Sequence, residues 1–306
     1  MQLEFGIATP STLWDLNLSA RQAMVADIYQ QGFSHIYMAD HVAFRDGSGN
    51  DGLISCAALA QLHADIKVMT GIYLLPLRHP VAVARQLLTL AEQAPGRVLF
   101  GIGIGGEDPH EYAACGMDPR QRGRAANEAL EIITGLLAGD EVALQGAVFD
   151  VPATRVKPLP TEPVPIIVGG RSDAALNRTA AWADGWVGVW CSPGRYAQAL
   201  DHIHTEAELK GRGQTTWYHG YQPWVGVADN EADARQVVKS MMEGFYKIPF
   251  EKFERYVPYG TPEQVAEQLM PYAEAGSTFF NLKICTPNMA EEVSAGGEVV
   301  RAMQAG

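Results

Sequence analysis

The stretch Arg97-Val-Leu-Phe-Gly-Ile-Gly-Ile-Gly-Gly106 decides which fold the chain is expected to adopt. Its apolar run from Val98 to Ile104 is too short for a free-standing helix, is rich in β-branched residues and is closed by glycines. Such a run predicts a strand buried on both faces, as the strands of parallel sheets are. The acidic segment Glu107-Asp-Pro-His-Glu111 follows at once, so we expect functional groups where this strand ends.

Three of the glycines, Gly101, Gly103 and Gly106, spell the G-x-G-x-x-G motif of dinucleotide-binding sites. The motif lies far from the first strand, and the acidic residues after it would repel a pyrophosphate. The acidic residue that should close a second strand about 20 residues later is also missing, because Glu128 falls within an expected helix. We therefore expect the glycines to let a flat ligand approach the backbone.

The composition is that of a globular protein that acts on small molecules. Hydrophobic residues make up 47% of the 306 residues and charged residues 19%, so the chain can bury a large core. The formal net charge of -12, without a run of lysines or arginines, argues against nucleic acid or an anionic membrane as a partner. We expect a small organic substrate instead.

The cysteines and the N-terminal residues favour the cytoplasm. No signal-type apolar stretch opens the chain, and no apolar run is long enough to span a bilayer. The cysteines are widely spaced, so neither a metal site nor a disulfide framework is expected. They are Cys56, Cys115, Cys191 and Cys285.

Strand-like and helical segments alternate along the chain, which predicts helices packed on a parallel sheet. Eight strand–helix units indicate a (β/α)8 TIM barrel, which we expect to form a single domain over residues 1–306. The expected strands are Leu3–Thr9, His35–Asp40, Lys67–Leu75, Arg97–Gly105, Val164–Gly170, Gly185–Cys191, Trp217–Ala228 and Thr278–Ile284. The expected helices are Ser19–Gln31 with Ser19 as its cap, Leu53–His63, Pro80–Gln93, Pro119–Leu137, Asp173–Trp182, Gly194–Lys210, Glu231–Met242, Thr261–Ala275 and Met289–Met303.

Two insertions interrupt this alternation, one after the fourth strand and one after the seventh. The first, Glu141–Pro160, contains a small hairpin over Val142–Phe149 that turns at Gly146. The second is an aromatic segment from Phe245 to Tyr259. Reacting groups of such barrels lie at the carboxyl ends of the strands and on the loops after them, so the second insertion suits a lid over the site.

Several short motifs stand at the expected strand ends: Asp40-His41, Leu74-Leu-Pro76, Gly106-Glu107 and Gly169-Gly-Arg-Ser172. Three more stand elsewhere along the chain: Arg122-Gly-Arg124, Ala183-Asp-Gly-Trp186 and Gly260-Thr-Pro262. In this order they resemble the bacterial luciferase-like family of flavin- and deazaflavin-dependent oxidoreductases. Each motif is common by itself, but together they follow the family over nearly the whole chain. The resemblance implies a flavin or deazaflavin cofactor bound across the mouth of a (β/α)8 barrel.

An anion site is expected where the fifth strand gives way to a helix. Backbone amides, a hydroxyl and a guanidinium converge there on the positive end of the helix dipole. An ordinary helix N-cap would use the same residues, so an anion site and a simple N-cap both stay open. The resemblance implies that the flavin phosphate binds here. The residues expected to contact the cofactor are Ala8, Gly71, Ile72, Tyr73, Gly103, Gly105, Gly169, Gly170, Arg171 and Ser172.

The resemblance also implies a non-prolyl cis peptide at the end of the third strand. We expect one such bond among Gly71, Ile72 and Tyr73. The bulge that it makes would support the bent ring of a reduced cofactor.

Three residues are expected to do acid–base or hydrogen-bonding work: His41, Asp40 and Glu107. A histidine has an ordinary pKa near neutrality, and its strand-end position would aim this one into the barrel mouth. A purely structural role for His41 stays open. Asp40 is expected to orient His41 or to cap the next loop, and Glu107 is either a proton donor or a charge at a helix N-terminus.

Aromatic residues near the strand ends suit a site that shields a reduced cofactor from water. They predict a substrate that is apolar or aromatic. The residues expected to line the substrate pocket are Trp14, Trp190, His219, Phe245 and Tyr246.

The resemblance leaves the reaction between three hypotheses. With reduced FMN it is monooxygenation, which comes first by a small margin because monooxygenases are the broader class, and a separate flavin reductase would then be a partner. With the deazaflavin coenzyme F-420 (also written F420) it is hydride transfer, and Asp40-His41 and Gly106-Glu107 resemble that branch. A flavin-binding protein without catalysis is the third. A homodimer is expected in each case.

Overall fold

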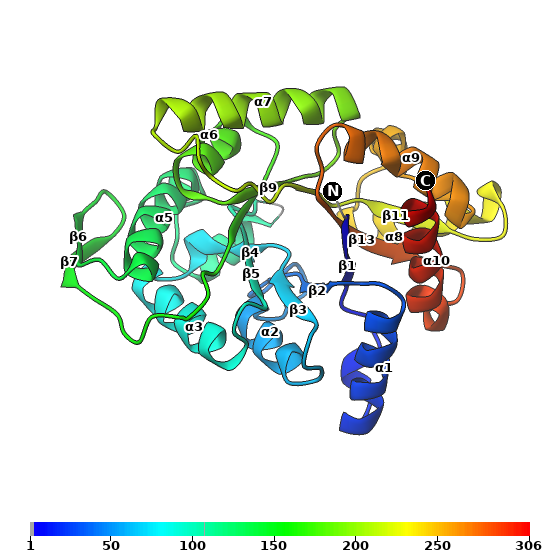
Figure 1. The fold of residues 1–306 in the computed structure, drawn as a ribbon, viewed down its shortest axis with the longest axis horizontal. Helices are drawn as coiled ribbons and strands as arrows, with labels where there is room; N and C mark the ends of the chain where they lie inside the picture. The colour runs from blue at the N-terminus through cyan, green and yellow to red at the C-terminus, as the bar shows by residue number, and fades with distance from the viewer. Residues whose placement is uncertain (1–2, 107) are drawn as a thin grey trace. The chain divides into compact units, whose positions relative to one another are not determined.

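Parallel strands alternate with helices in the computed structural model, which describes residues 3–106 and 108–306 (Figure 1). Neighbouring strands of the main sheet follow the order β1-β2-β3-β5-β8-β9-β10-β13, and β13 also pairs with β1, so these eight strands close on themselves. The predicted (β/α)8 barrel is therefore confirmed. The barrel strands are β1 (Glu4–Ala8), β2 (His35–Met38), β3 (Lys67–Thr70), β5 (Val98–Gly103), β8 (Ile166–Gly169), β9 (Gly185–Gly188), β10 (Gly220–Tyr221) and β13 (Phe279–Cys285).

Helices follow the barrel strands along the chain. They are α1 (Leu18–Gln30), α2 (Gly52–Ala60), α3 (Pro80–Gln93), α4 (Pro109–Ala114), α5 (Arg122–Ala138), α6 (Asp173–Trp182), α7 (Pro193–Leu209), α8 (Glu231–Tyr246), α9 (Pro262–Glu274) and α10 (Glu292–Ala305). Three short strands stand beside the barrel strands: β4 (Tyr73–Leu74), β11 (Trp224–Val227) and β12 (Tyr259–Gly260).

The chain divides into two compact units, which we describe separately. The terminal unit consists of Met1–Tyr37, Val187–His202 and Tyr218–Gly306. The central unit consists of Met38–Trp186 and Ile203–Trp217. The expected single domain over residues 1–306 stays a prediction.

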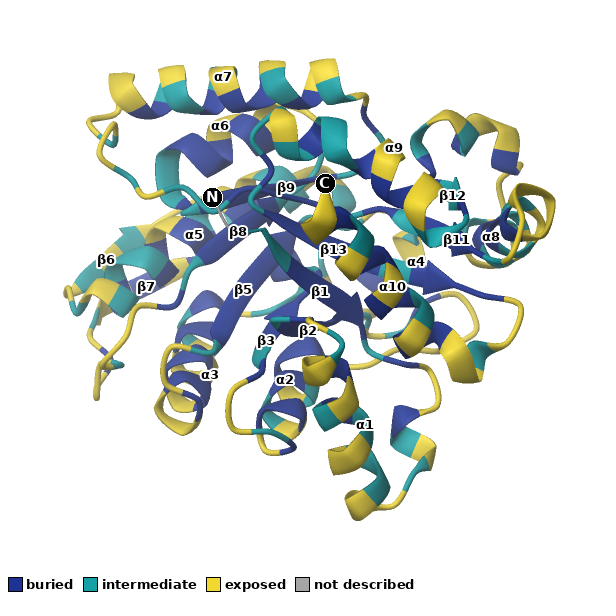
Figure 2. Ribbon diagram, turned by 45° about the vertical axis from the view of Figure 1, so that its right-hand side comes forward, coloured by how far each residue is buried: buried dark blue, intermediate teal, exposed yellow. Residues whose placement is uncertain are grey.

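The core of the central unit is built on β5, the strand that the sequence marked as doubly buried. All of Val98–Gly103 is buried, and β5 pairs in parallel with β3 and β8. Helices α3 and α5 turn their apolar residues inward, and Figure 2 shows each with a buried strip and an exposed strip. The apolar run that opened the sequence argument therefore lies where that argument placed it.

A hydrogen-bonded set of side chains runs through the interior of the terminal unit. Nε2 of His35 lies 2.6 Å from Oδ1 of Asn281, and Nδ2 of Asn281 donates to Oε1 of Gln222 at 3.0 Å. His35 and Asn281 are fully buried. Because buried polar groups need partners, this set links β2 to β13 and to the end of β10.

The first helix begins one residue earlier than predicted. Its N-cap is Asn17 rather than Ser19, because the extended Asn17 places its side-chain oxygen 3.0 Å from Ala20 N. Helices α3 and α6, by contrast, begin and end where the sequence predicts. The short helix α4 was not predicted.

The predicted seventh strand is divided into β10 and β11. Pro223 stands between them, and a proline has no N–H to donate to a ladder. Both parts pair in parallel with β13, so the position of the predicted strand in the sheet is unchanged.

The first insertion is a hairpin, but its second strand comes later than predicted. Strands β6 (Val142–Gln145) and β7 (Asp150–Thr154) pair antiparallel and turn after Gly146. Figure 1 shows the hairpin, in green, beside α5. Glu128 of α5 accepts hydrogen bonds from the N–H groups of residues 147, 148 and 149, at 2.9 to 3.0 Å.

The second insertion is more helical than predicted. Phe245 and Tyr246 belong to the last turn of α8. The residues after them form two short 3-10 helices, η4 (Phe250–Lys252) and η5 (Glu254–Tyr256).

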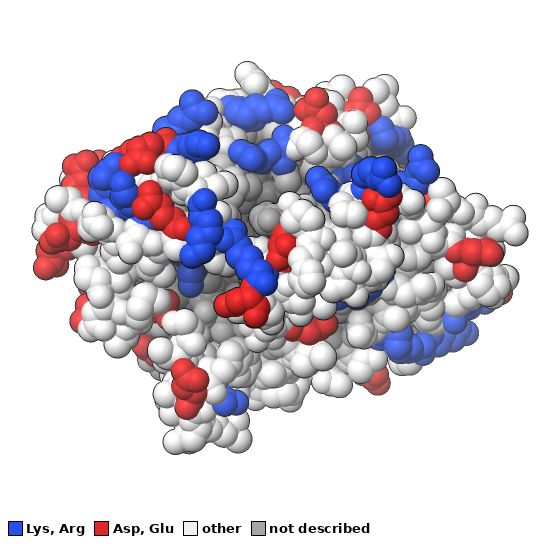
Figure 3. Space-filling model, turned by 180° about the vertical axis from the view of Figure 1, so that it is seen from behind, with Lys and Arg blue, Asp and Glu red and all other residues white. Residues whose placement is uncertain are grey.

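Acidic and basic side chains are interspersed on the face of the molecule that Figure 3 shows. This distribution agrees with a sequence that has a net charge of -12 and no basic run. Among the helices of the described residues, none is both long enough and apolar enough to cross a membrane.

Candidate active site

Asp40 joins three segments at the strand ends of the central unit. Its Oδ1 accepts a hydrogen bond from Gly52 N at 2.9 Å, and its Oδ2 accepts one from Leu74 N at 2.8 Å. Both oxygens also pair with the guanidinium of Arg78, at 2.6 and 2.7 Å. The buried carboxylate thus ties the segment after β2 to the start of α2 and to β4.

This arrangement decides between the two roles expected of Asp40. Its hydrogen bonds go to Gly52, Leu74 and Arg78, so it caps the next segments and does not orient His41. Burial raises the pKa of the Asp40 carboxyl above its ordinary value, although Arg78 and the two backbone N–H groups oppose the rise. Burial acts to lower the pKa of Arg78, but Asp40, Tyr73 and Asp51 together outweigh it and the net shift is upward.

A different carboxylate holds His41. Nδ1 of His41 lies 3.0 Å from Oε2 of Glu111, whose other oxygen accepts hydrogen bonds from Val42 N at 2.8 Å and Ala43 N at 3.1 Å. The Glu111 side chain is 3% exposed and the His41 side chain 18%. One buried carboxylate therefore fixes both the backbone after His41 and one nitrogen of its ring.

The helix that carries Glu111 is itself fixed on both sides. Asp108 caps α4 and accepts a hydrogen bond from Arg45 N at 2.6 Å, and Tyr112 donates its hydroxyl hydrogen to the backbone oxygen of Ile104. The ring of Phe44 covers the His41 ring, with 4.2 Å between the centroids. The segment between His41 and α2 is thus fastened to α4 at several points.

The peptide bond between Gly71 and Ile72 is cis, as predicted. The side chain of Ile72 lies against two glycines of neighbouring strands. A Cβ at Gly103 would stand 1.9 Å from Ile72 Cδ1, and a Cβ at Gly169 would stand 2.9 Å from the same atom. The two glycines therefore make room for Ile72.

This packing changes the explanation of the glycine motif. At Gly101 an added Cβ would lie 2.1 Å from the backbone oxygen of Thr70, and at Gly106 it would lie 3.3 Å from the Arg122 guanidinium. Gly105 has φ +58° and faces Leu74 and Tyr112. These glycines accommodate neighbouring protein atoms. Whether they also let a flat ligand approach the backbone stays a prediction.

The expected anion site has the geometry of a helix N-cap, and the capping hydroxyl can still donate a hydrogen bond. Ser172 caps α6, and its Oγ accepts a hydrogen bond from Ala175 N at 3.3 Å. Gly170 has φ +128°, and its oxygen is held by Nε1 of Trp186 at 2.7 Å. Because a hydroxyl that accepts one hydrogen bond can still donate its own hydrogen, the N-cap and anion-binding interpretations are compatible. Arg171 is exposed beside it.

Of the residues expected to line a substrate pocket, Trp190, Phe245 and Tyr246 meet in the terminal unit. The Trp190 ring lies edge-on to Tyr246 at 4.9 Å and tilted over Phe253 at 4.7 Å. Phe245 lies 4.9 Å from Tyr246 and is 37% exposed. Tyr246 also accepts a hydrogen bond from Nε1 of Trp224 at 3.2 Å.

Two further residues of the terminal unit lie at the end of β1 or after it. Ala8 is the last residue of that strand, at its carboxyl end. Trp14 lies in the short helix η1 (Leu13–Asp15), and Arg21 donates to its backbone oxygen at 2.6 Å and covers its ring at 5.3 Å. Whether either residue contacts a ligand stays a prediction.

The structure places His219 poorly for a substrate contact. It immediately precedes β10, and its oxygen accepts hydrogen bonds from the N–H groups of Thr278 and Phe279 at the start of β13. That is the amino end of the strands, whereas reacting groups of (β/α)8 barrels lie at the carboxyl ends. Whether His219 contacts the substrate stays a prediction.

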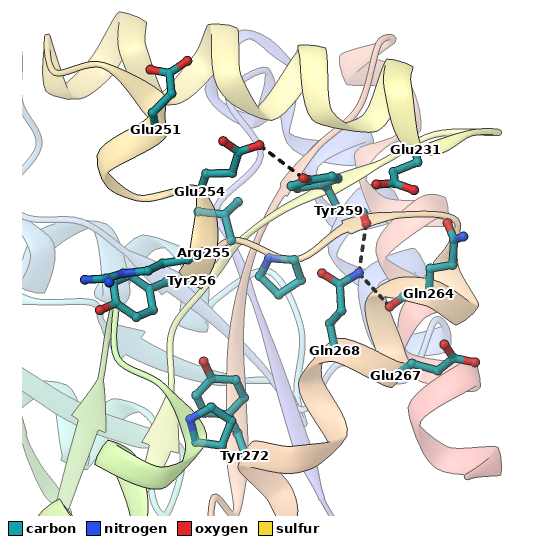
Figure 4. A pocket seen from close by; sticks show the side chains of 13 residues that line it. Glu231, Glu251, Glu254, Arg255, Tyr256, Tyr259, Gln264, Glu267, Gln268 and Tyr272 are labelled. Atoms are coloured by element: carbon teal, nitrogen blue, oxygen red, sulfur yellow. Dashed lines mark hydrogen bonds between the residues drawn. The ribbon is translucent and has the colours of Figure 1, made fainter.

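A pocket of about 670 Å³ opens in the terminal unit between η5, β12 and the first turn of α9 (Figure 4). Its acidic residues include Glu231, Glu251, Glu254 and Glu267. Much of its polar lining is bonded internally, as where Tyr259 donates to Glu254 at 3.2 Å. None of the residues predicted for catalysis, cofactor or substrate lines it.

Glu107, the third expected acid–base residue, lies outside the described residues. Glu111 and Arg78 belong to the site but were not predicted from the sequence. Glu111 stood in the acidic segment after the glycines, and Arg78 stood near the third strand end, but nothing in the spacing showed which side chains they would meet.

Comparisons with known proteins agree with this fold. Residues 4–278 match the family described as luciferase-like monooxygenase. An uncharacterised protein from Mycobacterium tuberculosis is 40% identical over 51% of this chain and 54% of its own length. The F420-dependent hydroxymycolic acid dehydrogenase of the same organism is 27% identical over 67% of this chain and 58% of its own length. The chain thus spans little more than half the length of these curated relatives.

Among solved structures, an F420-dependent secondary alcohol dehydrogenase, in complex with an F420-acetone adduct, superposes with a TM-score of 0.84. It is 17% identical, and the match covers 99% of both chains. At that identity the likeness concerns the fold alone.

Proposed function

Because the chain belongs to the luciferase-like monooxygenase family, we propose that it is an oxidoreductase that uses coenzyme F-420 to interconvert an alcohol and its carbonyl compound. The observation that carries the proposal is the hydrogen bond between His41 and Glu111. It occupies Nδ1, and in the described part of the chain Nε2 of His41 has no hydrogen-bond partner. A histidine held in this way suits proton transfer, which alcohol oxidation requires.

The central unit fits the cofactor at the place where a phosphoryl group would bind. The first turn of α6 offers backbone amides, the Ser172 hydroxyl and the Arg171 guanidinium at the positive end of a ten-residue helix. Gly170 in a left-handed conformation lets the backbone turn into that helix. FMN and coenzyme F-420 both carry a phosphoryl group, so the cradle suits either.

The chain's own part in the reaction is to move and hold a proton. When bound, oxidised coenzyme F-420 supplies the hydride acceptor for the carbinol carbon. Nε2 of His41 takes the hydroxyl proton while the O–H electron pair forms the carbonyl bond. Glu111 and Phe44 hold the ring by one edge and one face, which keeps Nε2 in a fixed place.

The curated relatives support the deazaflavin over the flavin. The hydroxymycolic acid dehydrogenase is named as F420-dependent, as is a glucose-6-phosphate dehydrogenase from Nakamurella multipartita that is 28% identical over 58% of this chain. Both names describe oxidation of a hydroxyl-bearing substrate. The apolar or aromatic character expected of the substrate stays a prediction.

The test compares the two cofactors directly. The purified protein is mixed with oxidised coenzyme F-420 and a panel of primary and secondary alcohols without oxygen, and the loss of cofactor fluorescence is followed. We expect turnover, and we expect His41→Ala to lower it on the order of 10²–10⁴-fold while cofactor affinity is kept. Turnover seen only with reduced FMN and oxygen would contradict the proposal.

A second candidate is the monooxygenase that the family's description favours. It would use reduced FMN and oxygen, and a separate flavin reductase would supply the reduced cofactor. Oxygen consumption that depends on both reduced FMN and an organic substrate would support it. Binding of either cofactor without any turnover would instead support the non-catalytic hypothesis.

Two properties accompany either activity as part of the proposal. We expect a homodimer, which sedimentation equilibrium tests, and a cytoplasmic location, which cell fractionation tests.

A further inference from the structure

We propose that Glu111 is the positioning residue of the active site, and that it keeps the proton of neutral His41 on Nδ1 and leaves Nε2 free to act as a base. This inference rests on the proposed function and extends it to a residue that the sequence did not assign. It follows from which atoms donate and which accept around one buried carboxylate.

Oε1 of Glu111 faces the backbone that follows His41. It accepts hydrogen bonds from Val42 N at 2.8 Å and Ala43 N at 3.1 Å. Both partners are backbone N–H groups, which can only donate. Oε1 therefore accepts two hydrogen bonds and, among the residues that the structure describes, has no acceptor to which it could donate. Any hydrogen on this carboxyl group would have to be on Oε2.

Oε2 of Glu111 lies 3.0 Å from Nδ1 of His41. A carboxylate can only accept, so the hydrogen between the two atoms belongs to Nδ1. Neutral imidazole carries one hydrogen, so Nε2 then bears a lone pair. When Nε2 takes the hydroxyl proton, the charge that develops on the ring lies beside the Glu111 carboxylate.

Asp40, the carboxylate nearest to His41 in sequence, is engaged elsewhere. Asp40 precedes His41 in the sequence, but its oxygens are engaged by Gly52, Leu74 and Arg78. The Phe44 ring restrains a face of the imidazole and offers no hydrogen-bonding atom. Glu111 alone, among the described residues, is bonded to the His41 ring.

The test is a substitution at Glu111 that keeps the shape of the side chain and replaces the oxygen facing His41 with a hydrogen-bond donor. In Glu111→Gln the amide oxygen can still accept from Val42 N and Ala43 N, and the NH2 group then faces Nδ1 as a donor. Nδ1 must accept, so the hydrogen moves to Nε2. The variant should therefore fold and bind cofactor like the parent while its base is blocked.

The first readout needs neither cofactor nor substrate. Long-range proton–nitrogen NMR of protein with labelled histidine reports which ring nitrogen carries the hydrogen, and a His41→Asn sample identifies the signal among the eight histidines. We expect the Nδ1–H tautomer in the parent and the Nε2–H tautomer in Glu111→Gln. An Nε2–H tautomer in the parent, or the same tautomer in both, would overturn the proposal.

The second readout is turnover of the alcohol. We expect kcat to fall on the order of 10²–10⁴-fold in Glu111→Gln, with cofactor Kd changed less than about twofold, as for a histidine held in the wrong tautomer. Glu111→Asp keeps a carboxylate and should restore part of the activity together with the Nδ1–H signal. An unchanged kcat in Glu111→Gln would refute the role.

A matched control comes from Glu128, which likewise accepts backbone hydrogen bonds, from Ala147, Val148 and Phe149. Glu128→Gln removes the same charge without touching a histidine, so tautomer and kcat should be unchanged. The two proposals can fail separately. A parent with the Nδ1–H tautomer but no alcohol turnover would leave the Glu111 geometry standing and overturn the proposed reaction, whereas the wrong tautomer with turnover would do the reverse.

Discussion

Replacing Gly101 by alanine should destabilise the protein strongly, because the new methyl group would meet backbone. An ideal Cβ at Gly101 lies 2.1 Å from the backbone oxygen of Thr70, and ordinary contacts begin near 3.4 Å, so the atoms are about 1.3 Å too close. Thr70 is also bound to Gly101 through its own hydroxyl, which donates to the Gly101 oxygen at 2.7 Å. Neither atom can rotate away, so β3 and β5 would have to separate.

The size of the effect follows from two opposing terms. Overpacking a core costs about 1–3 kcal/mol, and a clash with backbone belongs at the upper end of that range. The lower chain entropy of alanine returns about 0.5–1 kcal/mol. We therefore expect Gly101→Ala to lower the free energy of unfolding by about 2 kcal/mol or more, which lowers Tm by roughly 3 °C or more at this chain length.

Urea unfolding followed by circular dichroism, together with thermal melts, measures this loss. Gly244→Ala is the control, because that glycine lies in α8, is exposed, and has no atom within 4 Å of its ideal Cβ. It should leave stability unchanged or raise it by about 0.5–1 kcal/mol. If Gly101→Ala unfolds at the same urea concentration as the parent, the packing between β3 and β5 has been misjudged.

Three further variants test the other contacts. Asp40→Asn should lower the free energy of unfolding by about 3 kcal/mol, measured by urea melts, because it leaves Arg78 without its buried partner. Arg171→Ala with Ser172→Ala should raise the cofactor Kd in a fluorescence titration while Tm stays within a few degrees of the parent; an unchanged Kd would remove the anion site. Burial acts to raise the pKa of Glu128, but its three backbone hydrogen bonds outweigh it and hold that pKa below the ordinary 4.5. The loss of unfolding free energy caused by Glu128→Gln should therefore be largest near pH 7 and become smaller as pH falls below 4.5. A loss that does not depend on pH would contradict this.

The fold could be predicted because its signals are local and repeated. Helix α6 starts and ends where predicted because Ser172 is a capping residue that lies directly between a strand and a helix. Helix α3 starts at Pro80, and proline is favoured at the first position of a helix because the N–H that it lacks would have no partner there. Where two capping residues stood two positions apart, as Asn17 and Ser19 do, the sequence could not choose between them.

The site was predicted less well because its contacts join distant parts of the chain. Ile72 occupies the space beside Gly103 and Gly169, and no local pattern says that a side chain from another strand will fill that space. A glycine that admits a ligand and a glycine that admits a neighbouring side chain look the same in a sequence. Both kinds of glycine are needed because a Cβ would clash, and only the three-dimensional structure shows which atoms occupy the space.

The partner of His41 shows the same limit where it matters most for function. Asp40 is adjacent in sequence, but successive residues of an extended chain point in opposite directions, so adjacency argues against contact. Glu111 is 70 residues away, yet it follows β5, the strand that lies two places from β2 in the sheet, and it stands in the first turn of α4, which contacts the loop after β2. In a parallel barrel the loops after the strands lie at one end. The carboxylate partner of a histidine that follows one strand is therefore best looked for after another strand. Acidic residues on the first turn of a helix, such as Glu111 on α4, suit that search, because the helix fixes their backbone while their side chains reach across to the neighbouring loop.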